Sequence, residues 1–156
     1  MDLTQAQLTA FKNAINADAN LTAARNAGDH GAIAAYYNAP ASPTVSIYRP
    51  NVPSQEVVSC IASNTEWGTL SQASRDYFAI LCTQPYVDVT SPNVQAMLIA
   101  IFPNATTPTT RSALLTALTR AATRLESMVA SSGVVPRALF GIIVTPNDVA
   151  RALAEG

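Results

Sequence analysis

The sequence predicts a mainly α-helical protein: a bundle of about five to seven helices with a short extended arm and a short strand or hairpin near the C-terminus. Apolar residues recur at three- and four-residue intervals through most of the 156 residues. Residues suited to helix N-caps precede these segments, and prolines and glycines separate them. The length predicts a single domain over residues 1–156, with a helical core and an extended arm at 44–53.

The N-terminal part of the chain is predicted to begin with helices. Thr4 is a suitable cap for a first helix to about Asp18, because Leu8, Phe11 and Ile15 recur at helical spacing. Shorter helices are predicted over 21–26 and 31–38. A segment containing two prolines then follows, and residues 44–49 alternate apolar and polar side chains with β-branched types, which predicts a short strand within the arm.

The central part of the chain is predicted to hold three more helices. Ser54 is a suitable cap for a helix ending near Asn64, and Thr69 with Gln72 fits a capping box for a helix through Thr83. Ser91 and Pro92 are typical of the start of a helix that runs through Phe102. This last segment is apolar nearly all round, so we expect it to be central or to lie at an interface.

The C-terminal part is predicted to contain one long helix, a strand and a last helix. The long helix begins at a cap on Thr109 or Thr110 and ends at Ser131. Residues 138–144 form a short apolar run that Gly141 interrupts and in which β-branched residues are frequent, which favours a strand over a helix. A final helix is predicted to start at Thr145 and Pro146 and to end near Ala154.

Charged residues are scarce in this chain. Lys and Arg number 9 against 10 Asp and Glu, so the formal net charge is −1, and charged residues make up 12% where soluble domains carry about 25%. No basic patch is expected to bind nucleic acid specifically. Either Thr, Ser, Asn and Gln solvate the rest of the surface, or other subunits cover much of it, because interface cores are depleted of charge.

The first residues lack the basic segment and apolar run of a secretory signal. We therefore expect the protein to be made and assembled in a cytoplasm. No stretch approaches about 18 uninterrupted apolar residues, so a membrane is not an expected partner.

No catalytic motif is recognisable in the sequence. The one histidine, His30, has no metal-ligand spacing to Cys60 or Cys82, and those two cysteines are far apart. The carboxylates are dispersed, and Glu56 and Glu66 are interpreted as surface groups. A phosphate-binding glycine loop and a serine nucleophile elbow are both missing. We expect no enzyme activity, no catalytic residues, no cofactor and no metal.

Several large or cationic side chains are candidates for an interface. Aromatic and arginine side chains are enriched at binding hot spots, and eight of the nine basic residues are arginines. Arg120 and Arg124 are four residues apart and are expected to share one face of the predicted long helix. This face is interpreted either as a ring contact or phosphate contact, or as a solvated face. The candidates are Tyr48, Arg49, Arg111, Arg120, Arg124 and Phe140.

Three stretches resemble a family of small structural proteins of tailed bacteriophages, encoded among head and tail genes. They are Leu3-Thr4-Gln5-Ala6-Gln7-Leu8 with Ala17-Asp18; residues 32–43 leading into Val45-Ser46-Ile47-Tyr48-Arg49; and residues 109–114 followed by 122–126. The resemblance extends in order to Leu139-Phe140-Gly141 and Asp148-Val149. Relatives often have Trp where this chain has Tyr48. The motifs are structural, and the family offers no catalytic residues to carry over.

The resemblance implies a virion structural protein. For a helix-rich chain of this size it favours a head–tail connector, or neck, adaptor: a ring homo-oligomer, such as a dodecamer, between the portal protein and the tail or neck proteins. The alternatives are a capsid decoration protein or another neck or tail component such as a tail terminator, and, from a different class, a small phage hydrolase. The expected location is the virion.

Overall fold

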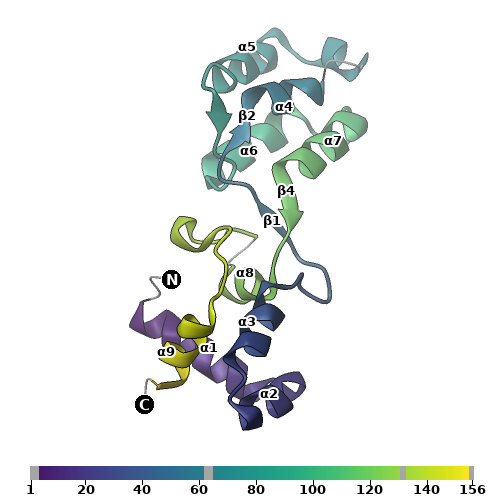
Figure 1. The fold of residues 1–156 in the computed structure, drawn as a ribbon. Coiled ribbons are helices and arrows are strands. Elements are labelled where there is room, and N and C mark those ends of the chain that lie inside the picture. Colours follow the sequence, from purple (N-terminus) through teal and green to yellow (C-terminus); the bar gives the residue numbers. More distant parts are fainter. Residues whose placement is uncertain (1–3, 62–64, 131–132, 155–156) are drawn as a thin grey trace. The chain divides into compact units, whose positions relative to one another are not determined.

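The computed structural model describes residues 4–61, 65–130 and 133–154. Figure 1 shows that helices dominate, which confirms the predicted mainly helical class. The chain divides into two compact units. Unit 1 contains the described residues up to 45 and from 121 onwards, and unit 2 contains residues 46–120. A single domain over 1–156 stays a prediction, since two compact units are compatible with one cooperative fold.

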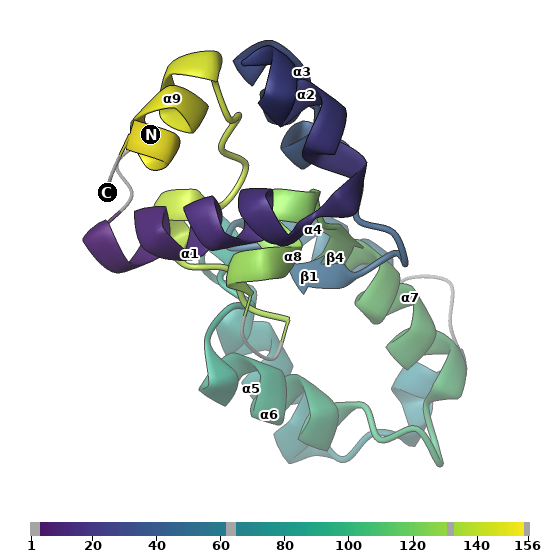
Figure 2. The same cartoon turned by 90° about the horizontal axis from the view of Figure 1, so that it is seen from below.

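The regular elements that lie wholly within unit 1 are helices. Its elements are α1 (Gln5–Ala17), η1 (Ala19–Leu21), α2 (Thr22–Ala27), α3 (His30–Asn38), α8 (Arg124–Val129), η3 (Arg137–Leu139) and α9 (Pro146–Ala154). Helix α9 lies against α1 and α3, although it is distant from both in sequence (Figure 2). The predicted cap of the first helix is confirmed: Thr4 and Gln7 form a capping box.

The core of unit 1 contains apolar side chains from both ends of the chain. Phe11 of α1 is fully buried and meets the ring of Tyr37 edge-on, with 4.8 Å between ring centroids. The Asn38 side chain binds both backbone groups of Val144, at 2.7 Å from the amide N and 2.9 Å from the carbonyl O. These two hydrogen bonds hold the segment before α9 against the end of α3.

Unit 2 combines helices with short strand pairs. Its elements are β1 (Ser46–Tyr48), β2 (Val52–Pro53), α4 (Ser54–Ser59), η2 (Thr65–Thr69), α5 (Gln72–Leu81), β3 (Tyr86–Val87), α6 (Pro92–Ile101), α7 (Pro108–Leu118) and β4 (Thr119–Ala121), the last ending as the chain returns to unit 1. Strand β1 pairs with β4. Strand β2 pairs antiparallel with β3, with Val52 opposite Val87. The core centres on Phe78, whose ring contacts those of Trp67 and Phe102.

The segment predicted as an arm is extended, as expected, but it pairs within the chain. Ile47 and Val52 are fully buried, and the Arg49 backbone N–H donates to the Leu118 carbonyl at 2.9 Å. Its alternating pattern therefore marks one buried face inside unit 2.

The prediction of one long helix from Thr109 is wrong. Helix α7 ends at Leu118, residues 119–121 form β4, and α8 starts afresh at Arg124. Thr123 and Glu126 form a capping box that begins the new helix, and pairing with β1 stabilises the extended backbone before it. The predicted helix ends at Asn64 and Ser131 lie outside the described residues, although α4 itself already ends at Ser59.

The predicted strand over residues 138–144 is also wrong. Between residues 133 and 145 the chain forms η3 and turns, without a strand. Leu139 and Val144 are buried, and Gly141 has a φ of 70°, a value that glycine adopts readily. The apolar run therefore reflects burial of single side chains in a turn-rich segment.

Candidate functional site

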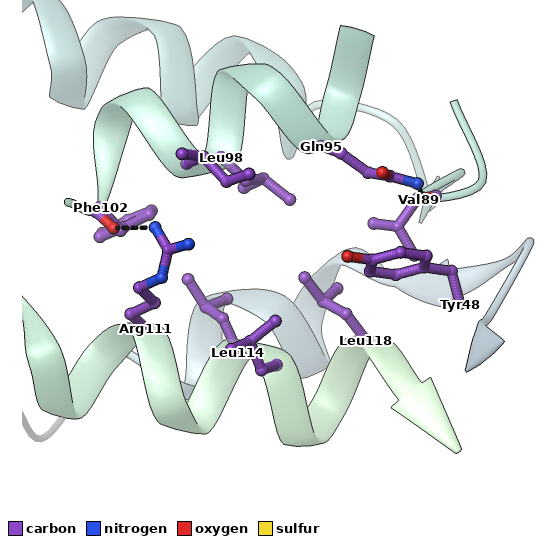
Figure 3. A pocket seen from close by; sticks show the side chains of 10 residues that line it. Tyr48, Val89, Gln95, Leu98, Phe102, Arg111, Leu114 and Leu118 are labelled. Atoms are coloured by element: carbon purple, nitrogen blue, oxygen red, sulfur yellow. Dashed lines mark hydrogen bonds between the residues drawn. The ribbon is translucent and has the colours of Figure 1, made fainter. Parts of the chain in front are cut away.

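Unit 2 contains a small apolar groove. It has a volume of about 70 Å³ and lies between α6 and α7 (Figure 3). Its 10 lining residues are Tyr48, Val89, Gln95, Leu98, Ile99, Phe102, Arg111, Leu114, Leu115 and Leu118. Arg111 is the one charged side chain among them. The groove is therefore suited to an apolar group with a negative charge beside it.

The polar groups of the groove lie at its two ends. At one end the Arg111 Nη1–H donates to the Phe102 carbonyl oxygen at 3.2 Å. This bond holds the guanidinium beside the end of α6 (Figure 3). At the other end, Gln95 donates to the Val89 carbonyl at 2.8 Å, and Figure 3 shows the Tyr48 ring lying beside Leu118 with its hydroxyl directed between the two helices.

Unit 2 carries several large apolar side chains that are exposed, at the groove and away from it. Ile99 is 52% exposed and Leu115 45% exposed, and both line the groove. The other exposed large apolar residues of unit 2 are Val58, Tyr77, Ile80 and Tyr86. In unit 1 the described residues add only Ile143. Of the described residues, unit 2 thus carries most of the large apolar side chains that are exposed.

The structure brings two of the sequence-predicted interface residues together. Tyr48 and Arg111 line the same groove, although they are 63 positions apart in the sequence. The sequence feature that could have indicated the groove is the α6 segment, which is apolar nearly all round the helix. Ile99 and Leu115 were not identified as site residues, because their exposure depends on how α6 and α7 pack.

Arg49 is instead engaged inside unit 2. Its guanidinium binds both carboxylate oxygens of Glu56, at 2.6 Å and 3.1 Å, and also donates to the Ala117 carbonyl at 2.6 Å. The bidentate pair links the end of β1 to α4, and the bond to Ala117 links it to α7. Glu56 is therefore a structural partner of Arg49, and with 37% of its side chain exposed it is also at the surface, as predicted.

Arg124 belongs to a polar cluster in unit 1. Its guanidinium lies 4.0 Å from the centre of the Tyr36 ring and donates to the Tyr36 carbonyl at 2.8 Å. The Tyr36 hydroxyl binds the Asp18 carboxylate, and this hydrogen bond is the main reason why the pKa of Asp18 is lowered and that of Tyr36 raised. These residues line a second, more polar hollow with Ser42 and Ser127.

The remaining two candidates lie elsewhere. Arg120 is half-buried in β4, and Phe140 is half-buried in the turn after η3. Because Arg120 precedes the start of α8 and Arg124 is its first residue, the prediction that they share one helix face is wrong. Arg124 and Phe140 belong to unit 1, and the other four candidates belong to unit 2.

The two cysteines are partly buried, and Glu66 binds backbone groups. Burial raises the pKa of the Cys82 thiol to about 11 and also raises that of Cys60. Glu66 accepts hydrogen bonds from the backbone N–H groups of Thr109 and Thr110, at 3.0 Å and 2.8 Å, and so caps α7 from a distant part of the chain. Among the residues that the structure describes, no group of three His, Cys, Asp or Glu side chains is placed to hold a metal.

Comparison with known proteins adds no relative: no protein-family model, curated protein or solved structure matches this chain. In the described ranges, no helix is long and apolar enough to span a membrane.

Proposed function

We propose that this protein is a structural subunit of a tailed-bacteriophage virion, a head–tail connector adaptor that forms a ring between portal and tail. The observation that carries the proposal is the apolar surface of unit 2, where Tyr77, Ile80, Ile99 and Leu115 are each at least 45% exposed. Exposed apolar side chains gathered on one unit are typical of surfaces that bind other proteins.

The composition supports assembly as the role of that surface. Only 12% of the residues are charged, and well-solvated surfaces carry about 25–35%. Burying the apolar surface of unit 2 against neighbouring subunits stabilises the assembly by about 25 cal/mol for each Å² of apolar area removed from water. The small groove, with one cation, suits a protein side chain better than a substrate that must be held from several sides.

The choice of a virion, and of the neck within it, rests on the resemblance of three stretches to small phage structural proteins and on the helix-rich fold. Decoration proteins are the main alternative, because they also need an apolar surface and no catalytic site. The two differ in partner and symmetry.

The test is the mass of the purified protein in solution, measured by light scattering alone and after mixing with portal complexes of the same phage. We expect ring-sized assembly on the portal, whether the free protein is a monomer or already a ring. A stable trimer that ignores portal and binds capsids would indicate decoration. A monomer that binds neither would contradict the proposal.

A further inference from the structure

The outer face of α5 is an apolar surface that unit 2 leaves uncovered. Tyr77 is 59% exposed and Ile80 65% exposed, and the two lie three residues apart, on neighbouring positions of one helix face. Phe78 on the opposite side is buried in the core. Helix α5 therefore has apolar groups on both sides, and only one side is buried within unit 2.

This outer face also carries a carboxylate. Asp76 is exposed, and its Oδ1 accepts a hydrogen bond from the Gln72 side chain at 2.8 Å. No arginine or lysine of the described chain forms an ion pair with it. Arg75, its neighbour, donates instead to the Leu70 carbonyl. The outer face of α5 thus combines one negative charge with two large apolar side chains.

The groove between α6 and α7 has the complementary character. Its one charge is the guanidinium of Arg111, which donates to a carbonyl, and no carboxylate of the described residues pairs with it. Its rim is formed by exposed Ile99 and Leu115. Its volume of about 70 Å³ is half that of an engineered cavity of about 150 Å³ that binds benzene, so it suits one aliphatic side chain.

We infer that the outer face of α5 in one copy docks into the α6–α7 groove of the next copy, with Ile80 entering the groove and Asp76 pairing with Arg111. Helix α5 contributes no residue to the groove lining. The two surfaces are therefore separate patches of unit 2, and Figure 1 shows α5 apart from α7. Contacts between two different patches are heterologous, and repeating one closes a ring when the rotation permits.

Charge reversal tests the pairing of Asp76 with Arg111. Asp76→Arg and Arg111→Asp each place like charges in contact, so each lowers the self-association constant at least tenfold. The chain that carries both substitutions regains most of the wild-type association. Sedimentation velocity measures the free proteins, and the mass of protein bound per portal measures templated assembly. Unchanged association of both single variants, or no recovery in the double variant, would overturn the inference.

Mixing two disabled variants tests the head-to-tail geometry. Leu115→Glu blocks the groove and Ile80→Glu blocks the α5 face, and each variant alone is expected to stay monomeric. Together they retain one usable pair of surfaces, so the mixture forms 1:1 dimers and nothing larger. A mixture that stays monomeric, or one that rebuilds full-sized assemblies, contradicts the proposed contact. Circular dichroism and urea unfolding confirm that both variants fold.

This inference rests on the proposed self-assembly, and the two fail differently. If the wild-type protein assembles neither alone nor on portal, the proposed function fails. If the wild-type protein assembles and the substitutions at Asp76, Ile80, Arg111 and Leu115 leave assembly unchanged, only the docking of α5 into the groove fails.

Discussion

Glu126 and Gly141 are joined by a hydrogen bond of 2.8 Å, donated by the Gly141 backbone N–H to Glu126 Oε1. The carboxylate is fully buried. Its other oxygen accepts from the Thr123 N–H at 3.0 Å, which completes the capping box of α8. One side chain therefore begins a helix and also holds the turn that replaces the predicted strand near the C-terminus.

Replacing Glu126 with Ala is expected to lower the free energy of unfolding by about 3 kcal/mol, because buried N–H groups lose a charged acceptor and a cavity forms. Glu126→Gln keeps the shape and one acceptor oxygen, and is expected to cost less. Urea unfolding measures both. If the Ala variant is within about 0.5 kcal/mol of wild type, the carboxylate does not hold the turn at Gly141.

Arg49→Ala is expected to destabilise the fold by about 1 kcal/mol, since it removes a bidentate, partly exposed ion pair and a bond to the Ala117 carbonyl. Arg49→Lys recovers little of this, because an ammonium cannot bind both oxygens in the same way. Urea midpoints measure the loss, and Glu56→Gln provides the matched partner change. Equal stability of the Lys variant and wild type would show that the bidentate geometry contributes nothing.

Tyr36→Phe is expected to raise the pKa of Asp18, because the Tyr36 hydroxyl is the main cause of its lowering. A carboxyl whose folded pKa lies below its unfolded value of about 3.9 stabilises the fold above that pH, and the contribution is lost as the pH falls through the folded pKa. The stability difference between wild type and variant should therefore shrink in acid. NMR titration of the Asp18 carboxyl carbon follows the shift, with Tyr37→Phe as the control; an unmoved Asp18 titration would exclude the hydroxyl as its cause.

Gly28→Ala is expected to destabilise the protein by about 1–2 kcal/mol. Gly28 ends α2 with a φ of 66°, a left-handed conformation that a Cβ disfavours. Gly68→Ala is a matched control, because a Cβ there also has no neighbouring atom within 4 Å and the residue lacks a positive φ. Thermal unfolding compares the two variants, and equal melting temperatures would contradict a backbone origin of the effect.

Much of the helical structure could be predicted because its signals are local. The capping box of Thr4 with Gln7, the Ser91-Pro92 start of α6 and the helical spacing of Phe11 and Ile15 depend only on near neighbours in the chain. The charge deficit left two interpretations open, a surface solvated by uncharged polar residues or one covered by other subunits, and the second stays a prediction. The apolar character of α6 predicted a central or interface helix, and its Leu98 and Ile101 are buried in the core of unit 2.

The groove was not predicted from the sequence, because its residues meet only through packing. Tyr48 and Arg111 were identified from residue type, yet their proximity depends on β1 lying against the end of α7. Arg49 and Glu56 were interpreted as an interface residue and a surface group, but a pair seven positions apart forms only where the chain folds back after β1.

The sequence by itself determined the helical class, the starts of α1, α6 and α9, and the shortage of charge, since these follow from local capping, periodicity and composition. The caps predicted at Ser54, Thr69 and Thr109 or Thr110 are wrong, because α4, α5 and α7 begin after Pro53, Ser71 and Thr107. Only the tertiary structure decided that the long apolar and Thr-rich C-terminal segment breaks at Thr119, that Glu126 is buried, and that α5 keeps an uncovered apolar face. Each of these depends on a partner far away in the chain: β1 for β4, Gly141 for Glu126, and the core around Phe78 for the side of α5 that is buried. Burial and pairing between distant segments are properties of the packed chain, and local preference does not encode them.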